Sequence, residues 1–564
     1  MNLSPEKKIA GVLAPLFALR REDDLGIGDL AALREFIEWV AASGFKLVQL
    51  LPINETGGDN SPYNAISAMA IEPTTLHLAP GCPEDLTTED FESALAGVDL
   101  VELRRGSVRY PQVKKLNRHL LEKAFSRFGV HASEDRRSNF RKFCEEERAW
   151  LDDYVFFRAL MEENGEKENW DEWPLEHQSI DAARNWFRAL PPERQSNFAT
   201  RQNFFRYVQW VAHAQWREIK SFAEASGVAL MGDIPFGVSY YSADVFARRD
   251  EFALEWSGGA PPELYFRDDQ FTQKWGQNWG IPLYRWAAMR ARNFDWWRQR
   301  VRGMRQIFHL FRIDHVLGFY RIYAFPWRPA QNRNFLPLDW NEMLGRTGGS
   351  APHFAPRDDA SWENCEANRR EGEEYLRVVL QEAENTCVVG EDLGTVPDYV
   401  RPHLHALGIA GFKIPQWEFY QGRMTPGHEY QRLSVATYAT HDHKPIRKLW
   451  EEAIERPSSA SDQARHDLNR IAEFARFQPN EATNFGKDFY PAIMEALFAC
   501  DSWIAMVMLT DLLKRKYRFN VPGTAANSNW TRRLQRTIAQ LKSSRVGRAQ
   551  MRLIRGLLEK TGRC

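Results

Sequence analysis

Three acidic residues, Asp314, Glu391 and Asp442, each stand at the end of a short apolar run, in FHLFRID, CVVGED and VATYATHD. Carboxyl groups that meet in one cavity can break a glycosidic bond. One attacks or stabilises the anomeric carbon, and the other, kept protonated, gives a proton to the leaving oxygen. In a site that retains configuration, the two carboxyl groups should lie about 5 to 5.5 Å apart. The sequence therefore predicts that distant segments bring these acids together.

The neighbours of the three acids indicate different roles. Arg312 lies two residues before Asp314, so both side chains point to one face of a strand, and its fixed charge should keep Asp314 ionised and nucleophilic. Glu391 follows an apolar strand and a glycine with no adjacent cation, which favours a raised pKa and a general-acid role. Asp442 lies beside His441, and both could hydrogen-bond a sugar ring and hold it distorted.

Each of these features also has a simpler interpretation. Arg312 and Asp314 could form a structural ion pair, and because Asp392 follows Glu391, one of these two acids must point away from the cavity. The segment 441–443, His-Asp-His, resembles the H-x-H ligands of metal-dependent barrel hydrolases. Such sites need further His and Asp ligands at other strand ends. Those ends offer mainly carboxylates and an arginine, so we expect no metal and no cofactor.

Eight apolar runs separated by helical patterns must position these residues. The first helical pattern begins behind Asp29, a good N-cap residue, and stops at Gly44. Continuous apolar strands alternating with helices predict a parallel sheet covered on both faces, and eight of them predict a (β/α)8 TIM barrel, class α/β. An open doubly wound sheet is the competing fold, but no G-x-G-x-x-G or P-loop motif follows the early runs. The runs span residues 11–20, 46–54, 228–233, 308–314, 387–392, 409–415, 435–442 and 503–511.

Polar residues mark the points where these runs end, and the carboxyl ends of barrel strands carry the chemistry in such folds. Within the fourth run, Phe311 and Ile313 should then pack outward against helices, while Arg312 and Asp314 face the barrel axis. The residues at run ends are Asn54, Asp233, Asp314, Glu391, Asp442 and Asp511.

A barrel needs only about 250 residues, so insertions must account for much of this chain of 564 residues. We expect residues 1–53 to form the first part of the barrel, 54–200 a mainly helical insertion after strand 2, and 201–564 the remainder. Within the remainder, residues 238–290 are rich in glycine, proline and aromatic residues and predict a loop insertion over the active site, with 257–284 as its cover.

Composition excludes several partners. With 74 Lys and Arg against 75 Asp and Glu, the net charge of -1 gives no indication of a nucleic-acid or acidic-membrane partner, and no apolar stretch approaches a membrane span of about 20 residues. Six scattered cysteines without a C-x-x-C motif favour reduced thiols and a cytoplasmic protein. The apolar run near the start lacks a cleavage site and contains Pro15, which argues against a signal peptide. The aromatic share of 13%, with 20 Trp, includes flat rings that suit stacking under sugars.

Longer motifs make the sequence similar to a known family. Over nearly the whole chain it resembles the 4-α-glucanotransferases called amylomaltases or disproportionating enzymes, relatives of the α-amylases. The matching motifs, in chain order, are SPYNAISA (61–68), GDIPFGVSYYSADVFA (232–247), GAPPELY (259–265), GQNWGIPLYRW (276–286), FRIDHVLGFYRIY (311–323), GEDLGTVP (390–397), GFKIPQWEF (411–419), THDHKPI (440–446) and FNVPGT (519–524).

The resemblance implies a barrel without the β-domain that follows it in α-amylases, and a retaining mechanism through a covalent glucosyl-enzyme. It implies Asp314 as nucleophile, Glu391 as acid/base and Asp442 as stabiliser of the transition state. It also implies transfer of segments between maltooligosaccharides, with amylose or glycogen-derived glucans as further substrates. Trp417 is a weaker candidate for an acceptor site. The substrate-binding positions implied by the same motifs are Ser61, Tyr63, Asp233, Gln277, Trp279, Arg312, His441 and Asn520.

The sequence also departs from the family pattern and leaves alternatives open. After THD it reads HKPIRKLW instead of the small or Thr-rich continuation of many members, which bears on the acceptor side. An α-amylase-like hydrolase shares the covalent intermediate, and a non-catalytic glucan-binding protein is the alternative from another class. Aromatic acceptor sites and loops that shield the intermediate from water favour transfer. His315, His441 and His443 could tune the pH dependence.

Overall fold

Eight parallel strands form a barrel at the centre of the chain in a computed structural model, which describes residues 3–263, 269–457, 461–480, 482–522 and 528–564. Each of the eight apolar runs contains or adjoins one of these strands, so the predicted barrel is confirmed. The strands are β1 Ile9–Leu13, β2 Leu47–Gln49, β3 Ala229–Pro235, β6 Leu310–Asp314, β9 Cys387–Gly390, β10 Gly411–Lys413, β13 Ser434–Ala436 and β14 Ile504–Met508.

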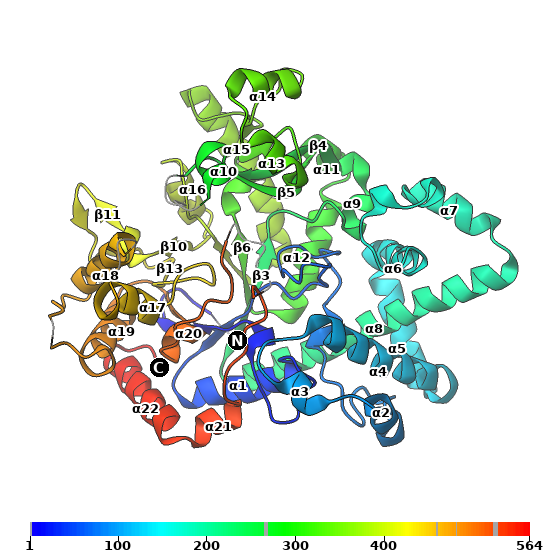
Figure 1. Cartoon of the computed structure of the whole chain (residues 1–564), viewed down its shortest axis with the longest axis horizontal. Coiled ribbons are helices and arrows are strands. Elements are labelled where there is room, and N and C mark those ends of the chain that lie inside the picture. Colours follow the sequence, from blue (N-terminus) through cyan, green and yellow to red (C-terminus); the bar gives the residue numbers. More distant parts are fainter. Residues whose placement is uncertain (1–2, 264–268, 458–460, 481, 523–527) are drawn as a thin grey trace.

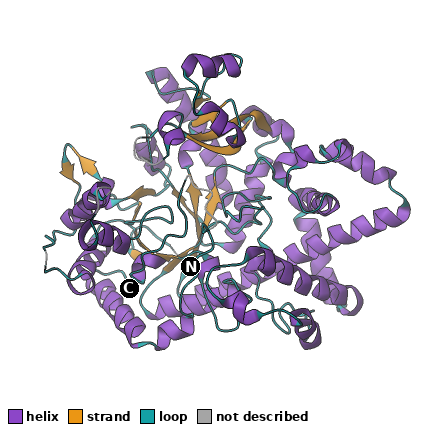
Figure 2. Cartoon of the chain, in the orientation of Figure 1, coloured by secondary structure: helices purple, strands orange, loops and turns teal. Residues whose placement is uncertain are grey.

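The strand order closes the barrel. Hydrogen-bonded neighbours run β10-β13-β14-β1-β2-β3-β6-β9, and a parallel bridge between Val389 and Ala410 joins the two ends. Helices surround the strands, as Figure 2 shows by colour. Strands that all run in one direction around a closed barrel place all their carboxyl ends on one face.

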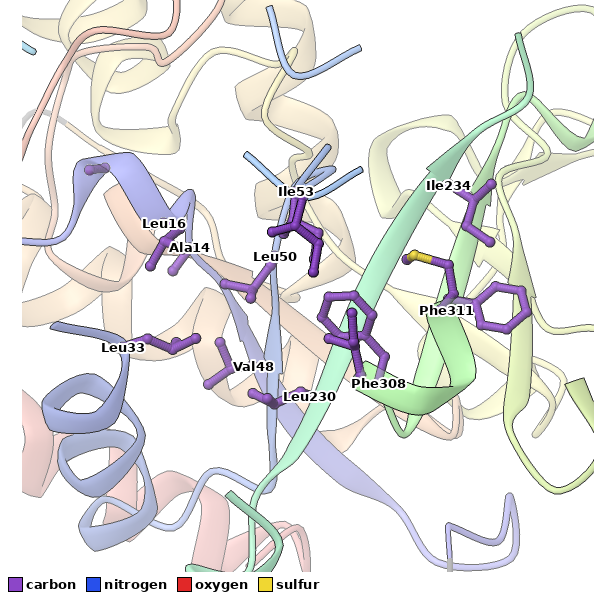
Figure 3. Packing of buried hydrophobic residues seen from close by; sticks show 14 of the residues in the cluster. Ala14, Leu16, Leu33, Val48, Leu50, Ile53, Leu230, Ile234, Phe308 and Phe311 are labelled. Atoms are coloured by element: carbon purple, nitrogen blue, oxygen red, sulfur yellow. The ribbon is translucent and has the colours of Figure 1, made fainter. Parts of the chain in front are cut away.

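Side chains alternate between the inside and the outside of the barrel. Leu310 belongs to an inner cluster with Leu47 and Met231, whereas Phe311 and Ile313 belong to the larger cluster between strands and helices. Figure 3 shows the outer layer, in which side chains of the strands and of helix α1 pack together. This alternation agrees with the predicted outward packing of Phe311 and Ile313, and it directs Arg312 inward.

Helix α1 (Leu30–Ala42) follows the predicted signals. The Asp29 side chain accepts a hydrogen bond from the backbone N–H of Ala32 and caps the helix, and Gly44 takes a φ of +94° just after it. The remaining helices outside the insertions complete the outer layer or extend from it. They are α12 Asp295–Ile307, α14 Trp340–Arg346, α15 Trp362–Ala383, α16 Val400–Ala406, α17 Ile446–Trp450, α18 Asp462–Phe474, α19 Tyr490–Ala499, α20 Leu509–Leu512, α21 Ile538–Ser543 and α22 Arg545–Lys560.

The segment between β2 and β3 is mainly helical and projects to the right of the barrel in Figure 1. Its last helix, α8, is 34 residues long and runs through residue 200, so the insertion returns to the barrel within a continuous helix. The helices of this segment are α2 Thr88–Leu95, α3 Leu100–Arg104, α4 Tyr110–His131, α5 Glu134–Glu146, α6 Arg148–Glu163, α7 Ile180–Ala189 and α8 Pro192–Ala225.

The expectation of loops over 238–290 was wrong, because this segment supplies two strands of a second sheet. The four strands pair antiparallel in the order β5-β4-β7-β8, and β7 and β8 come from the chain after β6. Register shifts at Gly258 and Gly259 interrupt the pairing of β4 with β5, so no regular alternation marks these strands in the sequence. The elements are β4 Phe252–Ala260, β5 Gln277–Tyr284, β7 Ile322–Phe325 and β8 His353–Ala355, with the short helices α9 Ala243–Ala247, α10 Gln270–Lys274, α11 Trp286–Ala291 and α13 Asn332–Phe335 beside them.

A small hairpin, β11 (Phe419–Tyr420) with β12 (Arg423–Met424), extends from the barrel after β10. Among the helices of the described residues, none is long and apolar enough to cross a bilayer. All six cysteines are free.

Candidate active site

A cavity of about 3170 Å³ opens at the carboxyl ends of the barrel strands. Its wall includes Asp314 at the end of β6 and Glu391 just after β9. The structure brings ten of the eleven predicted site residues to this one wall. They are Ser61, Tyr63, Gln277, Trp279, Arg312, Asp314, Glu391, His441, Asp442 and Asn520.

Asp233, the eleventh predicted residue, does not line the cavity. It lies on β3, is 1% exposed, and its Oδ2 accepts hydrogen bonds from the Tyr63 hydroxyl at 2.7 Å and from Arg312 Nη1 at 2.5 Å. Asp233 thus lies behind two residues of the cavity wall, and its contact with sugar stays a prediction. Asp233 and Arg312, 79 residues apart in the sequence, become partners because β3 and β6 pair side by side and place the two residues opposite each other.

Arg312 joins Asp233 to Asp314. Its buried guanidinium also donates from Nη2 to Oδ1 of Asp314, whose side chain keeps 29% of its surface exposed to the cavity. The guanidinium remains charged at any relevant pH, and a paired cation favours the ionised carboxylate. One oxygen of the Asp314 carboxyl group is therefore oriented by a buried cation.

Glu391 has the opposite electrostatic environment. Burial, and then the negative charge of Asp314, raise the pKa of Glu391 to about 8, although Arg312 and a backbone hydrogen bond from His315 oppose this shift. Its Oε2 accepts from the His315 N–H at 2.8 Å and its Oε1 from the Leu393 N–H at 3.2 Å. At neutral pH this carboxyl group is mostly protonated, as a general acid requires.

The neighbouring Asp392 points away from the cavity, which resolves the ambiguity between the two adjacent acids. Its Oδ1 accepts from the Phe412 N–H at 2.6 Å, and its Oδ2 pairs with Arg401 Nε at 3.1 Å. It is 2% exposed. Asp392 thus ties the end of β9 to β10, and of these two acids Glu391 is the one that lines the cavity.

Asp442 is held on both carboxylate oxygens. Oδ2 lies 3.1 Å from His441 Nε2, and Oδ1 accepts from the Asn520 amide at 2.6 Å. Burial opposes ionisation of Asp442, but the interaction with His441 and the hydrogen bonds from His441 and Asn520 outweigh it and lower the pKa below its usual range. The His441 ring stacks on Tyr63 with centroids 5.1 Å apart. Asn520, predicted as a glucan contact, is thus bound to a carboxylate.

Trp279 presents a ring to the cavity. It is 39% exposed, its Nε1 donates to Gln277 Oε1 at 3.2 Å, and its ring meets the His315 ring edge to face, with centroids 4.7 Å apart. Ser61 acts on the backbone, because its hydroxyl accepts from the Tyr63 N–H at 3.3 Å. Gln277 and Trp279 come from β5, so the second sheet supplies part of the cavity wall.

Trp417 and Lys444 line another part of the cavity. Trp417 is 38% exposed and its ring lies 5.0 Å from that of His443. Lys444, which belongs to the unusual HKPIRKLW continuation, pairs with Glu452 at 2.9 Å. His443 and Lys444 follow Asp442 in the chain, so this part of the wall adjoins Asp442.

Sequence reasoning missed two contributors to this site. Glu263 lines the cavity, and burial raises its pKa; its position as the only carboxylate within the matched motif GAPPELY was a usable signal. The His315 backbone, which binds Glu391, has a φ of +49°, and the sequence gives no sign of this. Residues 264–268 of the expected cover, and residues 523–524 of the FNVPGT motif, lie outside the described residues.

The two histidines of the H-x-H segment, in which a metal site was considered, contact different neighbours. Nδ1 of His443 lies 2.8 Å from Thr440 Oγ1, while His441 faces Tyr63 and Asp442. Within the described ranges, no group of three or more His, Cys, Asp or Glu side chains converges in a way that could hold a metal ion. The two histidines of the H-x-H segment are thus engaged with different neighbours.

Together, the parallel (β/α)8 barrel and the acids around one cavity at its carboxyl face define a class of enzyme that acts on glycosidic bonds. A family model described as 4-alpha-glucanotransferase matches residues 14–539. The chain therefore belongs to the 4-α-glucanotransferase family, and it is an enzyme of that activity.

Individual relatives agree with this placement. The 4-alpha-glucanotransferase of Chlamydia pneumoniae is 30% identical over 545 residues, which is 94% of this chain and 92% of the relative. The 4-alpha-glucanotransferase of Aquifex aeolicus is 27% identical over 551 residues, with coverages of 95% and 97%. The solved amylomaltase from Streptococcus agalactiae in complex with acarbose is 22% identical, with a TM-score of 0.72 over 99% of this chain and 100% of that one, which shows the same fold.

Proposed function

We propose that this enzyme transfers α-1,4-glucan segments between maltooligosaccharides by a double displacement that retains configuration. The observation that carries the proposal is the contrast between two carboxyl groups on one cavity wall. Asp314 is bound to the buried Arg312, whereas burial raises the pKa of Glu391 to about 8. A nucleophile needs the first state and a general acid needs the second.

In the first step, an Oδ atom of Asp314 attacks the anomeric carbon of the donor. The glycosidic C–O bond breaks, and Glu391 gives its proton to the leaving oxygen, which departs as the 4-hydroxyl of the released sugar. In the second step, the 4-hydroxyl of an acceptor sugar loses its proton to Glu391 and attacks the same carbon. The ester bond to Asp314 breaks, so both carboxyl groups return to their starting states and the configuration is retained.

The other residues of the site bind the glucan or position the residues that do. Asp442, held by His441 and Asn520, is a fixed negative charge suited to the hydroxyls and to the positive charge that develops on the reacting sugar. Asp233 acts behind Arg312 and Tyr63 and positions both of them. We propose Trp279 and Trp417 as stacking surfaces for sugar units, because each has an exposed ring in the cavity wall.

Transfer competes with hydrolysis, which uses the same intermediate. A cavity of about 3170 Å³ has room for several sugar units, and an acceptor oriented on an aromatic surface gains a large advantage over water. Amylose and glycogen-derived glucans are expected substrates on the same grounds. The six free cysteines are consistent with a reducing compartment such as the cytoplasm.

Incubation with maltotriose tests the proposal. Glucose and a ladder of longer products should form while total reducing ends stay constant, whereas a steady rise in reducing ends would indicate a hydrolase. The Asp314→Asn and Glu391→Gln variants should each lose about 10²-fold or more of maltotriose turnover. Glu134→Gln, an exposed change on α5, is the control and should leave turnover unchanged.

A donor with an activated leaving group separates the two roles. Fluoride leaves without a proton, so Glu391→Gln should still release fluoride from α-maltosyl fluoride in a single turnover, while Asp314→Asn should not. Full maltotriose turnover in Asp314→Asn would contradict the catalytic assignment and favour a glucan-binding role for these acids.

A further inference from the structure

The residue after the proposed nucleophile contacts the proposed acid/base directly through its backbone. His315 takes a left-handed conformation, with φ 49° and ψ 55°, immediately after β6 ends. Its N–H donates to Oε2 of Glu391 at 2.8 Å, and the next amide, of Val316, donates to the Glu391 carbonyl oxygen at 3.1 Å. Two consecutive amides therefore hold Glu391, one at its carboxyl group and one at its backbone.

This contact depends on an uncommon backbone conformation. A φ above zero is rare outside glycine, although Asn, Asp and His adopt it more readily than other residues. The left-handed residue follows the end of the strand at Asp314, and its own amide and the next one point toward residue 391, which directly follows the neighbouring strand β9. Alanine at this position would strain the same conformation, whereas glycine would keep it freely.

The ring of His315 has a separate task. It is in edge-to-face contact with Trp279 at 4.7 Å and 82°, and it lies 6.5 Å from the Phe236 ring. Trp279 needs such a neighbour because 39% of its surface is exposed to the cavity. Burial lowers the pKa of His315 to about 4, so the ring is neutral at neutral pH and adds no charge beside Glu391.

We propose that His315 is a positioning residue that holds the Glu391 carboxyl group through its backbone and the Trp279 ring through its side chain. The Glu391 carboxyl group and the Trp279 ring thereby keep a fixed position relative to each other. A sugar stacked on Trp279 then lies where Glu391 can donate its proton to the leaving oxygen. This inference rests on the proposed function of Glu391.

Loss of the backbone contact has a predictable electrostatic effect. Besides burial, the groups that act on Glu391 are the carboxylates of Asp314 and Asp392, the Arg312 guanidinium, and the N–H groups of His315 and Leu393. Of these, the His315 N–H belongs to residue 315 itself and is the contact that would be lost if this residue left the left-handed region. Because an N–H donor stabilises the carboxylate form, its loss raises the pKa of Glu391 and moves the basic limb of the kcat/KM profile to higher pH.

Four variants of the full chain test the two tasks separately with maltotriose. His315→Gly and His315→Asn remove the ring but keep the backbone, so each should raise KM several-fold, as Trp279→Ala does, with kcat and the pH profile nearly unchanged. His315→Ala should in addition lower kcat about tenfold or more relative to His315→Gly, and its basic limb should move upward. Fluoride release from α-maltosyl fluoride should differ little between the Ala and Gly variants.

Several outcomes would overturn the inference. Equal kcat and pH profiles in His315→Ala and His315→Gly would remove the backbone role, and equal slowing of both donors would indicate a merely structural defect. An unchanged KM in His315→Asn would remove the ring role, and this variant stays decisive if the Ala variant does not fold. Failure of the proposed function is distinguishable, because full maltotriose turnover in Glu391→Gln would show it without any change at residue 315.

Discussion

The nearest neighbours of each acid in this site set its electrostatic environment. Asp314 and Glu391 line one cavity, yet the guanidinium of Arg312 binds the first directly, whereas burial dominates the second. The side chain of Asp442 keeps 41% of its surface exposed, and its interactions with His441 and Asn520 outweigh the effect of burial and lower its pKa. The pKa values of Glu391 and Asp442 are thus shifted in opposite directions by their nearest neighbours, which is the pattern that acid-base chemistry at one pH requires.

A substitution at Asn520 tests how much a neighbouring hydrogen bond contributes to the function of Asp442, because the Asn520 amide donates to Asp442 at 2.6 Å. Asn520→Ala removes a hydrogen bond to a charged group, so we expect kcat/KM for maltotriose to fall about tenfold or more. The Asp442 carboxylate should also lose its fixed orientation, so the loss should fall mainly on kcat. Steady-state kinetics measures kcat and KM separately. A higher KM with an unchanged kcat would instead indicate the direct glucan contact expected from the motif.

The sequence was sufficient to find the acids and their near neighbours Arg312 and His441, but not their distant partners. Asp314, Glu391 and Asp442 were identifiable because each ends an apolar run, and this position depends only on local pattern. Asp233 bonds Tyr63 across 170 residues of sequence, and Asn520 bonds Asp442 across 78. Such pairs depend on how distant loops pack above the barrel. No local pattern predicts them.

At the scale of elements, strands buried on both faces were easier to predict than exposed ones. The barrel strands are continuous apolar runs such as β14, all five of whose residues are buried. In β4 the burial varies, and its register against β5 shifts at Gly258 and Gly259. Its other partner, β7, lies beyond β6 in the chain. A strand that pairs irregularly and with a distant segment carries little local signal, which explains why residues 238–290 were interpreted as loops.

Arg563 fixes the helix α22 to the barrel and gives a prediction at this scale. It is 0% exposed, and its guanidinium donates to the backbone carbonyls of Phe498, Ile9, Trp503, Cys500 and Ser502. These carbonyls lie at or near the amino ends of β1 and β14. Arg563→Ala would leave several of them buried without a donor, so we expect a loss of about 3 kcal/mol or more in the free energy of unfolding.

Chemical denaturation with and without the change measures this loss. Arg563→Lys should recover only part of it, because three N–H donors on one atom cannot reach the carbonyls that a planar guanidinium spans. Arg552→Ala, an exposed change on the same helix, is the control and should cost no more than about 0.5 kcal/mol. Equal stability of Arg563→Ala and Arg552→Ala would show that α22 is held by its apolar face alone.

For the whole molecule, the helical segment and the barrel share one core. A single cluster of buried side chains includes Phe157 and Phe204 from the helical segment together with Val12 and Phe311 from the barrel. Helix α8 connects them physically, because it packs against α4, α5 and α6 of the segment and also against α1 and α12 of the barrel. A core that continues across both parts predicts one cooperative unfolding transition.

His213 on α8 lets this prediction be tested through pH. It is buried against Phe143 and Trp150, neither ring nitrogen has a hydrogen-bond partner, and burial lowers its pKa to about 3. Its pKa in the unfolded chain is near 6.5, so below that pH the unfolded state binds a proton that the native state does not bind. The stability contributed by neutral His213 is therefore complete above pH 6.5 and is lost as pH falls toward 3.

His213→Leu removes this proton binding. The free energy of unfolding of the variant, relative to that of the original chain, should therefore rise by up to about 2 kcal/mol between pH 7.5 and pH 5. Scanning calorimetry at the two pH values measures it, and His428→Gln, at an exposed histidine, should show no such growth. Because α8 belongs to both parts of the core, the change should move one transition as a whole. Two transitions, with only the first one moved by the substitution, would mean that the helical segment unfolds independently and that the shared core does not couple it to the barrel.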